Sequence, residues 1–127
     1  IVFSRHARTE KMMSQLYTKW SNIMFHEPFG FSDFLTLERN ALCVLTDSGT
    51  VQEECCIFHI PCVTIRDVTE RPEVIECGGS ILSGVKEDDI ERCVKLVLSQ
   101  DKNWEIPEEY LRENVSDTVI KIITGYN

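Results

Sequence analysis

A turn with the sequence Thr-Asp-Ser-Gly-Thr, residues 46–50, joins an apolar run of strand length to a segment of helical character. Gly49 lets the backbone approach a ligand closely, and the N–H groups of Thr50 and Val51 lack intrahelical partners at a helix start. With the helix macrodipole, these donors suit an anion such as a diphosphate. The alternative is a self-capped turn, in which an Asp or Ser side chain takes the N-cap position and no ligand binds.

Two acidic residues, Glu53 and Glu54, follow Gln52 in the first two turns of the same predicted helix. A carboxylate there interacts favourably with the helix dipole whether or not a ligand is present. It could also accept hydrogen bonds from ribose hydroxyls. Both interpretations stay open at this point.

Basic residues supply the other candidate ligands for an anion. Residues 66–73, Arg-Asp-Val-Thr-Glu-Arg-Pro-Glu, place five charges in eight positions after another apolar run. They form either solvated ion pairs or a rim on which an arginine fork faces phosphate oxygens. His6, between Arg5 and Arg8, is either structural or, if it faces the same anion, a charged hydrogen-bond donor or an acid.

The elements that must position these groups alternate between strands and helices. Ser32 is the predicted N-cap of one helix. The strands are apolar throughout, which indicates an α/β fold with a Rossmann-like parallel sheet that carries helices on both faces. The predicted strands are 1–4, 22–25, 42–45, 62–65 and 80–82, and the predicted helices are 8–20, 32–40, 50–58, 72–76, 86–98 and 115–123.

In open parallel sheets, ligands bind beyond the carboxyl ends of the strands. The segments that follow the first four predicted strands hold most of the unusual polar residues. The pattern therefore predicts one rim that gathers His6, Ser48, Gly49, Thr50, Arg66 and Arg71.

Composition limits the classes of function. The chain has 127 residues, one domain's worth, and a formal net charge of −8. That charge argues against a nucleic-acid partner, which needs a basic face, but allows a local cationic pocket. No apolar run approaches the ~20 residues of a membrane span, so no membrane partner is expected. The chain opens with Ile-Val-Phe inside a predicted strand and shows no signal peptide, so we expect a fragment of a longer protein.

Six cysteines carry no Cys-x-x-Cys spacing, and two of them are adjacent. We expect free, reduced thiols in a cytoplasmic protein. A metal site needs clustered Cys and His ligands, and the sequence has no such cluster, so we expect no metal. The cysteines are Cys43, Cys55, Cys56, Cys62, Cys77 and Cys93.

Residues 46–54 and 66–73, with their order and gap, resemble the signature of the non-hydrolysing UDP-N-acetylglucosamine 2-epimerases. That signature runs Thr-Asp-Ser-Gly-Gly-hydrophobic-Gln-Glu-Glu, then Arg-Asp-x-Thr-Glu-Arg-Pro-Glu. Residues 4–9 resemble the family's His-Pro-Arg-Thr segment, with Ala7 in place of Pro. Residues 25–31 and 114–117 resemble epimerases of capsule and O-antigen pathways that end in UDP-N-acetyl-L-fucosamine.

The resemblance implies a glycosyltransferase-B-like fold with two lobes and nucleotide in the cleft between them. Residues 1–127 would form a single partial domain, the C-terminal UDP-binding lobe, without the N-terminal lobe and without the opening β-α unit of this one. It also implies a UDP-sugar substrate, no cofactor and a homodimeric full-length parent.

The matched positions imply roles for individual residues. Ser48, Gly49 and Thr50 match the diphosphate turn, with Thr50 in place of the usual second Gly. Glu54 matches the ribose-binding acid and Arg71 matches the cleft arginine. Phe34 matches an aromatic residue beside the uracil, and Phe29 stands where many members have Gln. His6 matches a cleft histidine that is needed for activity.

The implied reaction is removal of the C2 proton with anti loss of UDP, followed by reprotonation of C2 and re-addition of UDP to the 2-acetamidoglycal. The acid and base carboxylates would lie on the absent lobe, and this lobe would hold the departing UDP. A nucleotide-sugar glycosyltransferase lobe is one alternative, although it should lack the Thr-Glu-Arg-Pro-Glu segment. A non-catalytic module that binds nucleotide, or only a partner chain, is another.

Overall fold

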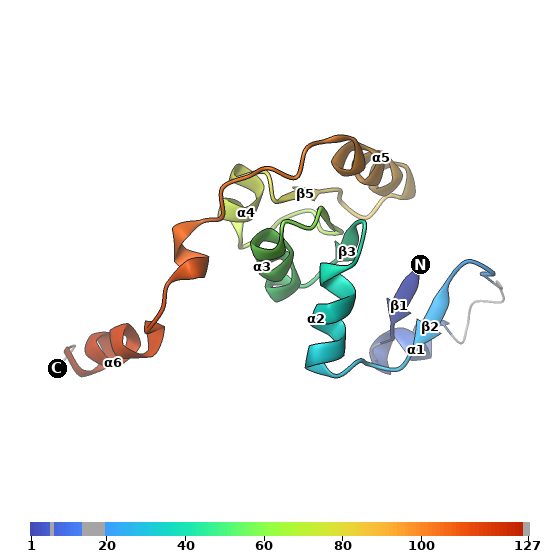
Figure 1. Ribbon diagram of the computed structural model, residues 1–127. Helices are drawn as coiled ribbons and strands as arrows, with labels where there is room; N and C mark the ends of the chain where they lie inside the picture. The colour runs from blue at the N-terminus through green and yellow to red at the C-terminus, as the bar shows by residue number, and fades with distance from the viewer. Residues whose placement is uncertain (6, 14–19, 126–127) are drawn as a thin grey trace. The chain divides into compact units, whose positions relative to one another are not determined.

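The computed structural model describes residues 1–5, 7–13 and 20–125. The chain divides into two compact units, Ile1–Leu37 and Glu38–Asn127 (Figure 1). Within the described residues, no helix is long and apolar enough to cross a membrane.

The first unit is a short parallel β-α-β arrangement. Strand β1, Val2–Ser4, pairs in parallel with β2, Met24–His26, and α1, Ala7–Met13, follows β1. The rings of Phe3 and Phe25 on the paired strands meet edge to face, with 5.6 Å between their centroids. The helix expected over residues 8–20 is thus found over its first part, and positions 14–19 lie outside the described residues.

Helix α2, Phe31–Arg39, begins one residue earlier than expected. The Phe34 N–H donates to the Gly30 carbonyl over 2.9 Å, which is the first bond of the helical ladder. Because the residue that provides this carbonyl holds the N-cap position, Gly30 takes that position. The prediction that Ser32 caps the helix is therefore wrong, since Ser32 lies inside the first turn.

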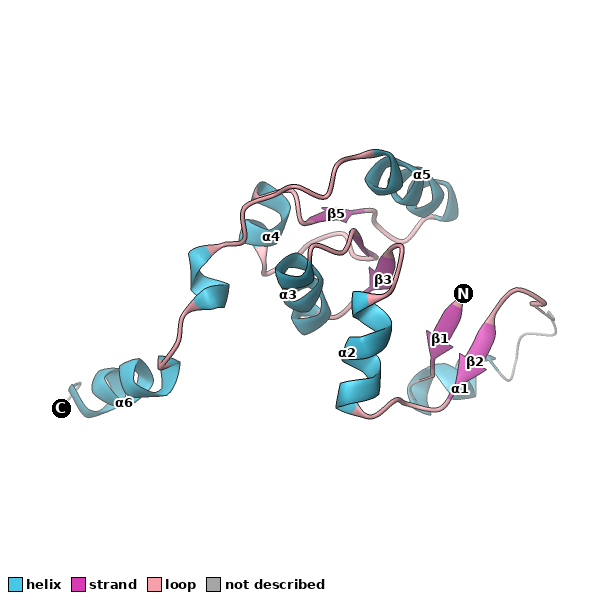
Figure 2. Ribbon diagram, viewed as in Figure 1, coloured by secondary structure: helices cyan, strands magenta, loops and turns pink. Residues whose placement is uncertain are grey.

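The second unit contains three parallel strands in the order β3-β4-β5 (Figure 2). Short connections and helices join them, in agreement with the expected β-α alternation. The 3-10 turn begins directly after Pro107. The elements are β3, Val44–Thr46; α3, Gly49–Phe58; β4, Cys62–Thr64; α4, Pro72–Glu76; β5, Ser80–Leu82; α5, Glu87–Ser99; a 3-10 turn, Glu108–Leu111; and α6, Val115–Gly125.

The middle strand, β4, carries the core of this unit. Its three side chains are all fully buried. Because successive side chains of a strand point to opposite faces, both faces of the sheet are covered at β4, and α3 and α5 both pack against it. Parallel pairing and the α/β class are thus as expected, but only the central strand is buried along its whole length, while Leu45 on the edge strand β3 is 46% exposed.

A hydrophobic core cluster includes the end of α3, where Cys55, Ile60 and Cys62 pack with half-buried Val44 and Phe58. These contacts join β3, α3 and β4 into one body. They fix the point at which β3 ends and α3 begins, which is the position of the predicted anion-binding turn.

Candidate functional site

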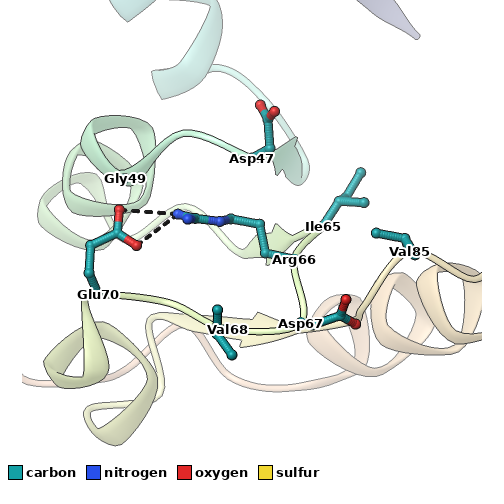
Figure 3. A pocket seen from close by; sticks show the side chains of 8 residues that line it. All are labelled: Asp47, Gly49, Ile65, Arg66, Asp67, Val68, Glu70 and Val85. Carbon is teal, nitrogen blue, oxygen red and sulfur yellow. Dashed lines mark hydrogen bonds and ion pairs between the residues drawn. The ribbon is translucent and has the colours of Figure 1, made fainter.

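An open hollow of about 500 Å³ lies at the carboxyl ends of the three strands in the second unit (Figure 3). Asp47 and Gly49 line it after β3, the segment from Ile65 to Glu70 lines it after β4, and Val85 lines it after β5. This is the edge at which parallel sheets bind ligands. The structure therefore places a concave surface where the rim was expected in this unit.

The start of α3 is not closed by its own N-cap side chain. Ser48 has the extended backbone of an N-cap residue, with φ −91° and ψ 132°, but its hydroxyl makes no capping hydrogen bond. Its Oγ lies instead 3.3 Å from Oγ1 of Thr50, and its N–H donates to Oγ1 of Thr46 over 3.0 Å. The arrangement thus differs from the self-capped turn and leaves the first helical N–H groups to another acceptor.

Gln52 ties this helix start to the loop after β4. Its side chain is fully buried, its Nε2 donates to the Ser48 carbonyl over 3.3 Å, and its Oε1 accepts from the Thr69 hydroxyl over 3.2 Å. That hydroxyl oxygen in turn accepts the Arg71 N–H over 3.1 Å. A chain of three hydrogen bonds therefore fixes the position of the Arg71 backbone relative to that of Ser48.

The guanidinium of Arg71 lies beside the first turn of α3. A Cβ atom built on Gly49 would lie 3.4 Å from both Cζ and Nη2 of Arg71. Nε of Arg71 donates to the Glu53 carboxylate, and this bond raises the pKa of Arg71. Oε1 of Glu70 lies 3.9 Å from Nη1 of Arg71. A phosphate at the helix start would therefore share Arg71 with two carboxylates.

The second arginine of the loop, Arg66, forms a local ion pair. Its Nη1 donates to both oxygens of Glu70, over 3.1 and 2.9 Å (Figure 3). These bonds lower the pKa of Glu70. Residues 66–73 therefore contain an ion pair of the kind that was one of the two alternatives from the sequence.

Glu54 lies one turn after Thr50, on a different side of α3 from Gly49 and Glu53. It is half-buried, and burial raises its pKa, while a hydrogen bond from Glu38 lowers it. Glu38, in the last turn of α2, is only 3% exposed. Desolvation, followed by the charge of Glu54, raises the pKa of Glu38 to about 7.

Sequence reasoning did not single out Glu38 or the bridging role of Gln52. A signal for Glu38 was available: it follows Phe34 by four positions and Leu35 by three, so it falls on the side of the helix expected to be apolar. A charged residue there indicates either a solvated helix edge or a buried carboxyl. The structure shows the buried carboxyl.

The structure brings Ser48, Gly49, Thr50 and Arg71 together, with Glu54 on the next turn of α3. The two aromatic candidates belong to the first unit, where Phe34 is half-buried and the Phe29 ring stacks on His26 with 4.1 Å between centroids. His6 lies outside the described residues.

The side chains near the helix start suit an anion with several oxygens. Free helical N–H groups and one arginine fork supply donors from two directions. In the part of the chain that the structure describes, no group of three or more His, Cys, Asp or Glu residues could hold a metal ion. The arrangement can bind a phosphate ester and stabilise negative charge on it.

Comparison with known proteins gives the context of this site. A family model described as UDP-N-acetylglucosamine 2-epimerase matches residues 1–124. The chain is 40% identical over 129 residues to the UDP-N-acetylglucosamine 2-epimerase of Methanocaldococcus jannaschii, covering 98% of this chain and 35% of that protein. It is 38% identical over 88 residues to the UDP-2,3-diacetamido-2,3-dideoxy-D-glucuronate 2-epimerase of Pseudomonas aeruginosa, covering 69% of this chain and 25% of that protein.

A solved structure supports the same relationship. The crystal structure of the Methanocaldococcus jannaschii UDP-GlcNAc 2-epimerase in complex with UDP-GlcNAc and UDP matches with a TM-score of 0.84 and 39% identity. The match covers 97% of this chain and 35% of that one, and it confirms the expected α/β fold. The chain spans about a third of the length of the Methanocaldococcus jannaschii enzyme and a quarter of that of the Pseudomonas aeruginosa enzyme. Because the family model matches residues 1–124, the chain belongs to the UDP-N-acetylglucosamine 2-epimerase family.

Proposed function

We propose that this chain is the C-terminal, UDP-binding lobe of a two-lobed UDP-N-acetylhexosamine 2-epimerase. The observation that carries the proposal is the helix start of α3, which its own cap side chain leaves open and beside which Arg71 is held. A solved relative that shares this fold holds UDP-GlcNAc and UDP. A diphosphate has the charge and the oxygen acceptors that such a helix start favours.

Each candidate residue has a role in this proposal. Ser48, Gly49 and Thr50 receive the diphosphate, and Arg71 approaches it from the loop after β4. Glu54 accepts hydrogen bonds from the ribose hydroxyls. Phe29 and Phe34 flank the base, and His6 faces the phosphates and serves the reaction directly.

The reaction proposed for the parent protein is elimination and re-addition of UDP. A base removes the C2 proton, the C1–O bond breaks with anti loss of UDP, and a proton then adds to the opposite face of C2 as UDP returns to C1 of the 2-acetamidoglycal. This lobe lowers the barrier by holding charge that develops on the departing diphosphate. The acid and base act from the other lobe, because Glu54 and His6 are assigned to the ribose and the phosphates.

The sequence favours this function over a glycosyltransferase lobe. Both would use a helix start to bind a nucleotide diphosphate. The Thr-Glu-Arg-Pro-Glu segment, residues 69–73, is expected only of the epimerase, and Thr69 and Arg71 within it form the link to Gln52 described above.

Three finer assignments go with the proposal. We place the parent in the cytoplasm, supported by six cysteines that are all free in the structure. We assign it to synthesis of capsule or O-antigen polysaccharide from the resemblance of residues 25–31 and 114–117. A homodimeric parent remains a prediction, which light scattering on the longer protein would test.

Calorimetry with UDP tests the site. Arg71→Ala should weaken UDP binding by ~1–3 kcal/mol, the typical cost of losing a charged hydrogen bond. Arg92→Ala is the matched control, because Arg92 also pairs with a nearby carboxylate, Asp89 at 2.9 Å, but on the exposed helix α5. Equal UDP affinity in wild type and Arg71→Ala would contradict the site. Absence of UDP binding to the wild-type chain would favour a partner-binding module.

A further inference from the structure

Glu38 is a buried acid without a conventional partner. It is 3% exposed, and both carboxylate oxygens are buried without a hydrogen-bond donor from any residue that the structure describes. Leaving a charged carboxylate in such a place is costly. A side chain of this kind calls for an explanation beyond packing.

The group that faces Glu38 is another acid. After burial, the charge of Glu54 and a side-chain hydrogen bond with it raise the pKa of Glu38, and the same hydrogen bond lowers the pKa of Glu54. Two ionised carboxylates offer only acceptors, so a hydrogen bond between them requires one proton. The more deeply buried partner is the one that keeps it, because burial disfavours the charged form. That partner is Glu38, and Glu54 is the acceptor.

We propose that Glu38 is a positioning residue for nucleotide binding: its protonated carboxyl donates to one oxygen of Glu54 and leaves the other oxygen of Glu54 for the ribose hydroxyls. The proposal rests on the assignment of Glu54 to the ribose made above. It adds that the ribose-binding acid is held in place by a proton, and therefore that UDP binding depends on pH through Glu38.

The surroundings of the pair set the direction of this dependence. The pKa of Glu38 is raised to about 7, first by desolvation and then by the charge of Glu54. Among the described residues, the thiols of Cys55 on α3 and Cys62 on β4 also interact with Glu38. Neither supplies a positive charge. Arg39, the next residue along α2, lies over the Phe58 ring at 5.2 Å.

Raising the pH through 7 should therefore remove the proton that joins the two acids. Glu38 would then repel Glu54, and Glu53 adds further negative charge beside Glu54. Glu53 is itself bonded to Arg71. The ribose-binding oxygen loses its fixed position, and the affinity for UDP falls. Below pH 7 the pair is intact.

The experiment measures UDP affinity by calorimetry at pH 6 and pH 8.5, in wild type and in Glu38→Gln. Glutamine has the same shape and donates from its amide at every pH, so the variant keeps the bond to Glu54 without a titrating proton. The phosphates and the base of UDP titrate equally in both proteins. We expect wild type to lose about ten-fold in affinity relative to Glu38→Gln between these pH values, as for loss of one hydrogen bond to a charged group.

A measurement on the unliganded chain separates this proposal from the proposed function. With ¹³C-labelled glutamate, NMR should show one carboxyl that titrates near pH 7, is absent in Glu38→Gln and titrates lower in Glu54→Gln. The same pH dependence of UDP affinity in wild type and Glu38→Gln would overturn the positioning role. Absence of a carboxyl that titrates near neutrality would overturn the shared proton. If that carboxyl is present but UDP binds at neither pH, the nucleotide site and the role of Glu38 in it both fail.

Discussion

The guanidinium carbon of Arg71 lies 3.4 Å from the point that a Cβ atom on Gly49 would occupy. Oε1 of Glu70 lies 3.3 Å from the same point. A glycine at the first position of α3 thus leaves room for these two side chains beside the helix start. In the proposed function, that space is where the diphosphate and Arg71 meet.

Gly49→Ala is therefore expected to impair binding more than folding. The new methyl group would displace the flexible ends of Arg71 and Glu70, which can move, while alanine suits a helix better than glycine by about 0.5–1 kcal/mol. We expect the affinity for UDP to fall at least ten-fold, while the free energy of unfolding measured in urea stays nearly unchanged. Gly125→Ala in α6, where a Cβ would contact nothing within 4 Å, is the control. If Gly49→Ala binds UDP as tightly as wild type does, UDP does not approach the backbone closely at Gly49.

Glu38→Gln should stabilise the chain at alkaline pH. The folded pKa of Glu38 is about 7, against an ordinary value of 4.5. As pH rises from 4.5 to 7, the unfolded state releases this proton while the folded state retains it, so wild type loses stability across that window. The glutamine variant avoids the loss, which amounts to about 3 kcal/mol for this shift at 1.36 kcal/mol for each pH unit.

Urea unfolding at pH 5 and pH 8 measures this difference. The two proteins should be close in stability at pH 5, and Glu38→Gln should be the more stable at pH 8. A constant difference between them at both pH values would contradict a shifted Glu38. This readout needs no ligand and is independent of the proposed function.

All six cysteines should titrate as free thiols in the denatured, unreduced chain. In the native chain, Cys55, Cys56, Cys62 and Cys93 are buried and should be protected. Of the two half-buried thiols, Cys43 should react slowly, because burial raises its pKa to about 11 and the thiolate is the reactive form. Cys77 should therefore react first, and Cys77→Ser should remove that phase. A count of four or fewer after denaturation would indicate disulfides.

This chain alone should not epimerise a UDP-sugar. Removal of the C2 proton needs a base within hydrogen-bond reach of that carbon, and the proposed roles aim Glu54 at the ribose and His6 at the phosphates. Losing general acid–base help costs ~10²–10⁴-fold for each group. The test incubates the chain with UDP-N-acetylglucosamine in heavy water and follows deuterium at C2. Incorporation well above a protein-free control, and lost in His6→Ala, would show that this lobe carries its own acid–base chemistry.

Local pattern was sufficient to predict most of the elements. The predicted helix over Pro72–Glu76 and the strand over Ser80–Leu82 are found at those bounds. Proline at the first turn and a short apolar run act over a few neighbouring residues, so they can be recognised without the fold. The helix start of α3 was predictable for the same reason, since the strand, the turn and the helix are contiguous in sequence.

The edges of the sheet depended on more than local pattern. Apolar residues in β3 and β4 look alike in the sequence, yet Leu45 is 46% exposed and Val63 is fully buried. The difference arises because β4 has a strand on either side and helices against it, and β3 is at the edge of its sheet. The neighbours of a strand are other segments of the chain. The pattern of apolar residues within one strand therefore does not show whether that strand lies at the centre or at the edge of its sheet.

The sequence by itself determined the parallel α/β fold and the turn between β3 and α3, because both follow from contiguous residues. Only the tertiary structure decided which polar and charged side chains meet. It placed Arg71 on Glu53, Thr69 on Gln52 and Glu38 beside Glu54, pairs that are 16 to 18 positions apart in the chain. Such pairings depend on how Glu38, α3 and the loop after β4 pack within the second unit. The physical reason is burial: packing sets the distance and the solvent exposure of each pair, and these decide whether two charges attract, compete for a ligand or share a proton.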